Sequence, residues 1–174
     1  MGLMDFTTDV ELKGEIWEKV LDKLVGLQGS TESFKIFDSY FDVFALSAAI
    51  GIMYDKRKPT VTSDKVFTVP RNVLIGSTRR QDLEFYLTTA IISSKTIDYT
   101  IDERLMIAFG EKETSFKGLK FLTEFANYGV DYIYDIITNH DLETMENIKD
   151  MLEKIEKNDL LDNLEIEVDS LENY

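Results

Sequence analysis

The sequence contains no cysteine, one histidine and only two prolines in 174 residues. Without cysteine there are no disulfides, no thiolate metal ligands and no cysteine nucleophile, which fits a reducing cytoplasm. The single histidine, His140, leaves too few ligands for the usual zinc sites and too few bases for most catalytic arrangements. The scarcity of proline favours long regular elements, most naturally helices.

Sequence motifs for common reactions are also missing. Neither G-x-G-x-x-G nor G-x-x-x-x-G-K-[ST], the two common phosphate-binding glycine motifs, occurs in the chain, and no serine lies in a nucleophile-elbow motif. The longest nearly apolar run, from Val43 to Tyr54, is too short to cross a bilayer. The start, MGLMDFTTDVE, lacks the basic segment of a signal peptide. We therefore expect a cytoplasmic, non-enzymatic protein that uses no cofactor, metal or membrane.

The side chains with catalytic or metal-binding potential that are abundant are carboxylates, since the chain has 33 acidic residues. The groups that could serve a magnesium ion are Asp82 with Glu84, Asp102 with Glu103, and Glu165 with Glu167 and Asp169. A hydrolytic metal site needs acids that converge on one point, and chance pairings are expected among so many acids. A metal-dependent nuclease is therefore only a third hypothesis.

Hydrophobic periodicity predicts helices over residues 7–29, 34–53, 77–94, 100–110, 116–128, 130–138 and 141–158. Gly29, Gly110 and Gly129 are expected to end three of these helices. Small residues from Ala45 to Gly51 leave a smooth face that another helix can approach closely. The fold predicted is an all-α single-domain bundle of about six helices.

The helix over residues 100–110 is expected to bury Leu105, Met106 and Phe109. The helical domain is expected to occupy residues 1–158, and an acidic C-terminal tail is expected over residues 159–174.

A long basic loop, residues 56–80, joins the second and third predicted helices. It holds seven basic residues and one acid, a local charge of +6. Since the net charge of the whole chain is −14, the remaining residues together carry −20. Pro59 and Pro70 keep it out of helix, and residues 61–69 are rich enough in β-branched residues for a short extended piece or hairpin. Its candidate binding residues are Lys56, Arg57, Lys58, Arg71, Arg79 and Arg80.

Two interpretations of these cations remain open. Arginine makes bidentate contacts with phosphate, so the loop could bind DNA phosphates or an acidic protein. Alternatively the cations are structural, because Lys56, Arg57 and Lys58 follow a helix C-terminus where positive charge is favoured. An acidic C-terminal helix could also pair with the loop.

The helix predicted over residues 141–158 carries a stripe of apolar residues at steps of 3, 4 and 3. Its members are Met145, Ile148, Leu152 and Ile155. This stripe covers barely two heptads, so docking on its own domain is favoured over a coiled coil. A second copy of the chain or a partner helix could also use it.

Two segments, FDVFALSAAIGIMYDKRKP and EFANYGVDYI, resemble a family of small helical proteins encoded with bacterial DNA-phosphorothioation and other phage-defence genes. The shared pattern is an apolar Phe/Ala helix, a glycine and a K-R-x-P turn, then Glu-x-Ala-x-x-Gly, here Glu124, Ala126 and Gly129. The resemblance covers residues 37–137 and implies an accessory component with no known active site.

Together these features predict an adaptor subunit of an anti-phage or DNA-modification system. Its partners would be protein subunits of a defence complex, with a possible contact to DNA. The alternative is a regulator whose acidic surface imitates DNA and occupies the basic groove of a DNA-binding protein.

Overall fold

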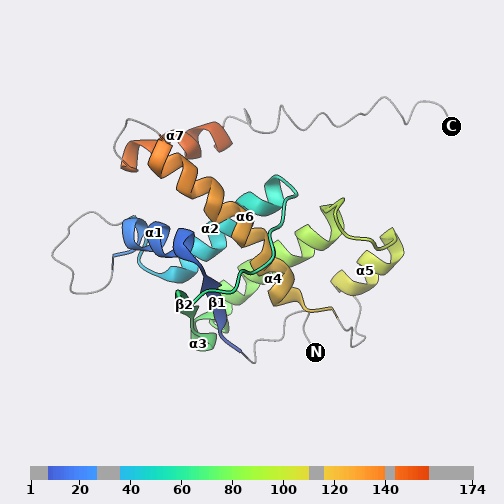
Figure 1. The fold of residues 1–174 in the computed structure, drawn as a ribbon. Helices are drawn as coiled ribbons and strands as arrows, with labels where there is room; N and C mark the ends of the chain where they lie inside the picture. The colour runs from blue at the N-terminus through green and yellow to red at the C-terminus, as the bar shows by residue number, and fades with distance from the viewer. Residues whose placement is uncertain (1–7, 27–35, 110–115, 140–143, 157–174) are drawn as a thin grey trace. The chain divides into compact units, whose positions relative to one another are not determined.

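The computed structural model describes residues 8–26, 36–109, 116–139 and 144–156 (Figure 1). The chain divides into two compact units, residues 1–134 and 135–174. In chain order, the described elements are β1 (Val10–Lys13), α1 (Glu15–Leu24), α2 (Tyr40–Met53), β2 (Val66–Val69), α3 (Arg71–Leu74), α4 (Ser77–Ser93), α5 (Ile101–Phe109), α6 (Gly118–Asn139) and α7 (Thr144–Glu156). The predicted helical bundle is confirmed, and a small two-stranded sheet accompanies it.

The helix predicted over residues 7–29 is wrong at its start. Residues Val10–Lys13 form β1, which pairs antiparallel with β2 from Val10 opposite Val69 to Lys13 opposite Val66. Val10 and Leu12 are buried while Glu11 between them is exposed, which is the alternation of a strand. Gly14, with a φ of 115°, turns the chain from β1 into α1.

The extended piece predicted in the basic loop is present as β2. Its partner strand is β1, near the start of the chain: Val69 pairs with Val10, which lies 59 positions earlier. The strand therefore ties the loop to the beginning of the chain.

The second predicted helix also begins later than expected, at Tyr40 instead of residue 34. The N–H groups of Ile36 and Phe37 donate to the carbonyl of Leu24, and Val25 forms a parallel bridge with Phe37. These bonds hold residues 36 and 37 extended beside the end of α1, so α2 cannot start there.

The predicted helices over residues 77–94 and 100–110 match α4 and α5 within a residue at each described end. The four-residue α3 was not predicted. α7 lies inside the range predicted for the C-terminal helix. Gly29, Gly110 and the acidic tail, residues 159–174, lie outside the described residues.

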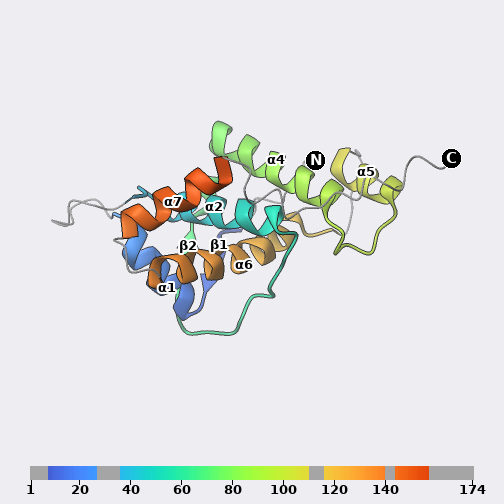
Figure 2. The same ribbon diagram turned by 90° about the horizontal axis from the view of Figure 1, so that it is seen from above.

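α6 is one helix of 22 residues, so the prediction that Gly129 ends a helix is wrong. Gly129 lies in the interior of α6 because it touches the backbone of α2: a Cβ there would stand 1.8 Å from the carbonyl oxygen of Ser47. Gly51 on α2 is equally constrained, since its Cβ would be 2.1 Å from the carbonyl oxygen of Phe125. The smooth face predicted around Gly51 is therefore a helix contact, and α2 lies between α6 and α4 (Figure 2).

A buried asparagine links this helix pair to the rest of residues 1–134. The side chain of Asn127 on α6 accepts a hydrogen bond from Trp17 Nε1 on α1 at 3.0 Å. Its amide nitrogen donates to the Lys58 carbonyl at 3.2 Å and to Thr60 Oγ1 at 3.3 Å. Asn127 thus satisfies its polar atoms with α1 on one side and the basic loop on the other.

Replacing Gly129 with alanine is expected to lower the free energy of unfolding by at least about 3 kcal/mol, because a rigid backbone occupies the Cβ position. The gain in helix propensity, about 1 kcal/mol, offsets only part of this. Gly76→Ala is the matched control: its Cβ would meet only the Val73 carbonyl oxygen, at 3.6 Å, so a change within about 0.5 kcal/mol is expected. Urea unfolding of both variants measures the difference, and equal stabilities would contradict the close approach.

Candidate functional site

Arg57, the central cation of the K-R-x-P turn, is fully engaged within the protein. Its guanidinium donates to the Oγ1 and carbonyl oxygens of Thr96, at 3.1 and 2.9 Å, and pairs with Glu124 at 3.2 Å. The same group lies 4.8 Å from the centre of the Phe121 ring. An arginine that stacks on an aromatic ring and makes hydrogen bonds in three directions acts as a clamp between elements.

The flanking lysines also contact α6. Lys58 forms an ion pair with Asp131, and its backbone N–H donates to the Glu124 carbonyl at 2.9 Å. Lys56 Nζ lies 5.5 Å from the centre of the Tyr128 ring. The two segments that carry the family resemblance therefore face each other, with the K-R-x-P turn held against the Glu-x-Ala-x-x-Gly stretch of α6.

The cations at the far end of the loop are engaged locally. The guanidinium of Arg79 stacks on Phe41 at 4.9 Å, and Arg80 pairs with Glu84 one turn along α4 at 2.9 Å. Lys65, in mid-loop, bonds Glu18 at 2.6 Å, and this hydrogen bond raises the pKa of the lysine above its ordinary value. Whether the six predicted loop cations also bind a partner stays a prediction.

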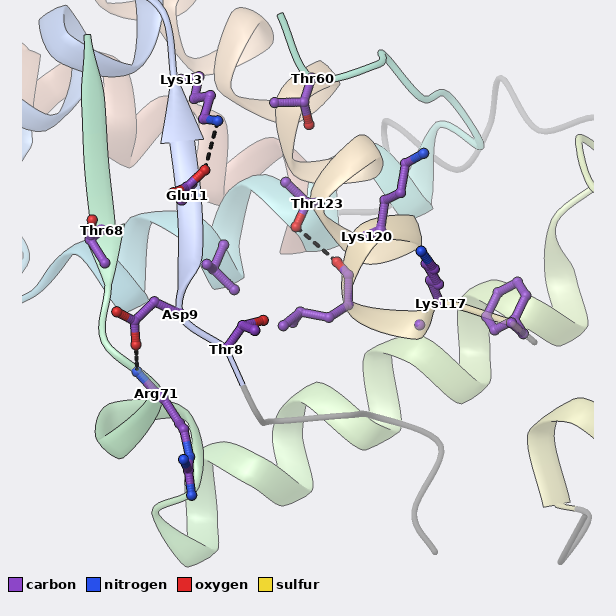
Figure 3. A pocket seen from close by; sticks show the side chains of 14 residues that line it. Thr8, Asp9, Glu11, Lys13, Thr60, Thr68, Arg71, Lys117, Lys120 and Thr123 are labelled. Carbon is purple, nitrogen blue, oxygen red and sulfur yellow. Dashed lines mark hydrogen bonds and ion pairs between the residues drawn. The ribbon is translucent and has the colours of Figure 1, made fainter. Parts of the chain in front are cut away.

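Arg71 differs from the other predicted loop cations. Its backbone N–H donates to Asp9 Oδ1 at 2.7 Å, while its guanidinium has no partner in the described part of the chain. Arg71 borders a groove of about 1200 Å³. Figure 3 shows β1, β2 and α3 on one side of this groove and the start of α6 on the other. No sequence pattern singled out Lys117 and Lys120, which line the groove just before and at the start of α6.

α5 exposes the apolar residues that were expected to be buried, so that prediction is wrong. Leu105, Met106 and Phe109 are 43%, 53% and 67% exposed. The helix packs on α4, and Ala108 is its one buried residue. Ile101 on α5 and Phe85 on α4 are also exposed, at 58% and 68%. We call the four exposed apolar residues of α5, namely Ile101, Leu105, Met106 and Phe109, the α5 surface.

The connection between α4 and α5 is firmly held. The Arg104 guanidinium donates to four backbone carbonyls in the last turn of α4 and the connection to α5, those of Ile92, Ser94, Ile97 and Tyr99. Thr100 and Glu103 form a reciprocal cap at the start of α5, and the N–H of Thr100 donates to Glu103 at 2.8 Å. This hydrogen bond lowers the pKa of the Glu103 carboxyl below its ordinary value.

The stripe predicted on the C-terminal helix lies on α7, in the unit of residues 135–174. Ile148 is 2% exposed and Leu152 is 48% exposed, while Ile155 is intermediate. The side chain of Met145 lies outside the described residues. Met151, which is not part of the predicted stripe, is buried, whereas Leu152 of the stripe is exposed. The buried residues therefore do not form the predicted continuous stripe. Whether α7 joins two copies or a partner stays a prediction.

Among the described residues, no group of three histidine, cysteine or carboxylate side chains is placed to hold a metal ion. His140 and the acids Glu165, Glu167 and Asp169 lie outside those residues. Within the same ranges, no helix combines the length and apolarity needed to span a bilayer.

The fold and these surfaces define a small helical protein whose described part offers two outward-facing features, an apolar helix surface and a groove bordered by cations. Residues 19–170 match the model of a protein family, and the chain belongs to that family, described as DNA sulphur modification system-associated protein 4. The match covers both segments on which the resemblance was based. No curated protein and no solved structure matches the chain.

Arg57→Ala is expected to lower the free energy of unfolding by about 2 kcal/mol, because it removes charge-assisted hydrogen bonds and a ring contact. Arg57→Lys should not restore it, since lysine lacks the planar fork. Arg71→Ala, which removes a guanidinium without a described partner, is the control and should change stability by less than about 0.5 kcal/mol. Chemical unfolding measures all three. An Arg57→Ala variant of full stability would instead favour a binding role for this turn.

Proposed function

We propose that this protein is a non-catalytic accessory subunit of a DNA sulphur modification system. It binds a larger protein subunit of the same system through the α5 surface. Family membership supports the setting. The choice of surface rests on one observation: the nine-residue α5 buries one residue fully and leaves four large apolar side chains more than 40% exposed.

Exposure on this scale is unusual for a monomer surface. Single exposed apolar residues are ordinary, but several on one short helix mark a site that another molecule covers. A side chain of this kind contributes nothing to binding while it stays in water. Buried against a partner, each contributes roughly 1.5–3 kcal/mol to the binding free energy. The α5 surface therefore resembles the centre of an interface, which is apolar and enriched in aromatic residues and Met.

The charges beside the α5 surface indicate the partner's chemistry. Asp98, Asp102 and Glu103 are exposed around the start of α5. Lys95 is the exposed cation of the preceding turn, whereas the charge of Arg104 is directed at backbone carbonyls. The margin is acidic, so it complements an apolar patch bordered by lysine or arginine. Such borders are expected on a subunit that handles DNA in the cytoplasm.

A second candidate follows from the charge distribution. Residues 135–174 hold 13 acids and three lysines, a net charge of −10, which leaves −4 for residues 1–134. An acidic unit of this kind could occupy the DNA-binding groove of a partner in place of DNA. It would then act as a regulator.

The test is co-expression of the chain with each protein encoded in its own DNA sulphur modification gene cluster, followed by a measured Kd for the subunit retained. The double variant Met106→Ser/Phe109→Ser is expected to raise this Kd at least tenfold, equivalent to about 1.4 kcal/mol. Val61→Ser is the matched control, because Val61 is 55% exposed but lies in the loop.

An unchanged Kd for the double variant, or an equal loss in Val61→Ser, would rule out the α5 surface. Competition by duplex DNA for the retained subunit distinguishes the two candidates. An accessory subunit docked through α5 stays bound when DNA is added, whereas a DNA mimic is displaced.

A further inference from the structure

We propose that the groove between the β1–β2 sheet and the start of α6 binds the phosphate backbone of duplex DNA through Arg71, Lys117 and Lys120. This goes beyond the proposed function, because the groove and the α5 surface share no residue. It also relocates the predicted DNA contact, since Arg71 is the only one of the six predicted loop cations that lines the groove.

The groove is assembled from segments far apart in sequence. Residues 8–11, Lys13 and Thr68 line the sheet side, and Thr60 and Arg71 come from the loop and the start of α3. The opposite wall consists of residues 116–120 and Thr123, at the start of α6. All of these residues belong to the unit of residues 1–134. The strand pairing of β1 with β2 and the hydrogen bonds of Asn127 hold these walls in place.

Three cations at the groove are uncommitted. The side chains of Arg71, Lys117 and Lys120 are on exposed residues and have no hydrogen bond, ion pair or ring contact with any described residue. In contrast, the loop cations Arg57 and Lys58 form ion pairs with carboxylates of α6. A positive charge without an internal partner is available to an external anion at no cost in broken contacts.

The two carboxylates in the groove wall are already occupied. Asp9 accepts the backbone N–H of Arg71 at 2.7 Å, and Glu11 pairs with Lys13 at 2.6 Å. Glu11 and Lys13 therefore cancel, and the three uncommitted cations outweigh the remaining acid, Asp9. The groove is thus locally positive in a unit whose net charge is −4.

The uncharged lining also suits phosphate. Thr60 Oγ1 accepts from Asn127, so its own proton remains free to donate, and the hydroxyls of Thr8 and Thr68 lie along the sheet wall. Thr123 is different, because its hydroxyl donates to the Leu119 carbonyl at 2.8 Å. Hydroxyls and cations are the side chains that most often contact DNA phosphates.

The placement of the cations favours a polyanion over a single phosphate. Figure 3 shows Arg71 at the β2–α3 side and Lys117 and Lys120 on the α6 side, so the charges stand on opposite walls. A chain of phosphates can contact both walls at once. Among polyanions, duplex DNA is favoured by the family's setting, and no aromatic platform for stacked single-strand bases lines the groove apart from Phe116.

The test is binding of a fluorescent 20-base-pair duplex, followed by anisotropy from about 25 to 200 mM salt. Three phosphate contacts predict a slope of log K against log salt of about −2.7. Each single variant, Arg71→Ala, Lys117→Ala or Lys120→Ala, should weaken binding at low salt and bring the slope closer to zero by about 0.9. Lys95→Ala removes the same charge away from the groove and should leave the slope unchanged.

Three results would overturn the proposal: no binding of the duplex at the lowest salt, an equal loss in Lys95→Ala, or tighter binding of duplex RNA than of DNA. Displacement by millimolar inorganic phosphate beyond the effect of chloride at equal ionic strength would overturn the polyanion assignment. The groove variants should retain the α5-dependent partner, and Met106→Ser/Phe109→Ser should retain DNA binding, so failure of either proposal is recognised separately.

Discussion

The backbone contact between α2 and α6 is the constraint on which the rest of residues 1–134 depends. At Gly51 and Gly129 the two helices touch without an intervening side chain, since a Cβ at either position would lie within 2.1 Å of a carbonyl oxygen on the other helix. This approach fixes how far Asn127 reaches toward α1 and where the chain leaves α2. Even a methyl group at this crossing would separate the helices and loosen both connections.

The basic loop follows from that crossing. Once α2 ends beside α6, the K-R-x-P turn lies along the helix, and Arg57 finds Glu124 and the ring of Phe121 within reach. Lysine and arginine near a helix end are often read as a binding patch. Here most of that positive charge compensates carboxylates of the same unit, so a charge count over residues 56–80 overstates what is left for a partner.

Several features could be read from the sequence because they depend on local pattern. The start of α5 follows from the cap formed by Thr100 and Glu103, and the loop follows from its two prolines. The smooth face near Gly51 indicated close helix packing. The family match confirms the resemblance carried by the segments 41–59 and 124–133.

Other features depend on residues brought together only by the fold. Val10 and Leu12 fit both a strand and a helix face, and the pairing with β2 decides between them. Gly129 resembles a helix stop until Ser47 is placed against it. Leu105 and Phe109 have the spacing of a buried helix face. That spacing alone does not show that no described residue covers the two side chains. Arg71 and Lys117 are 46 positions apart by their numbers, and their common groove has no signal in the sequence.

The bonds of Arg104 have a thermodynamic consequence for association. One guanidinium on α5 binds four carbonyls of the end of α4 and the turn that follows it, and so fixes the orientation of α5 before any partner binds. A helix that had to order on binding would lose backbone entropy of roughly 1–2 kcal/mol per residue at that moment. Here folding of the chain has already met that cost, so the apolar side chains of α5 are preorganised for rapid, rigid-body docking.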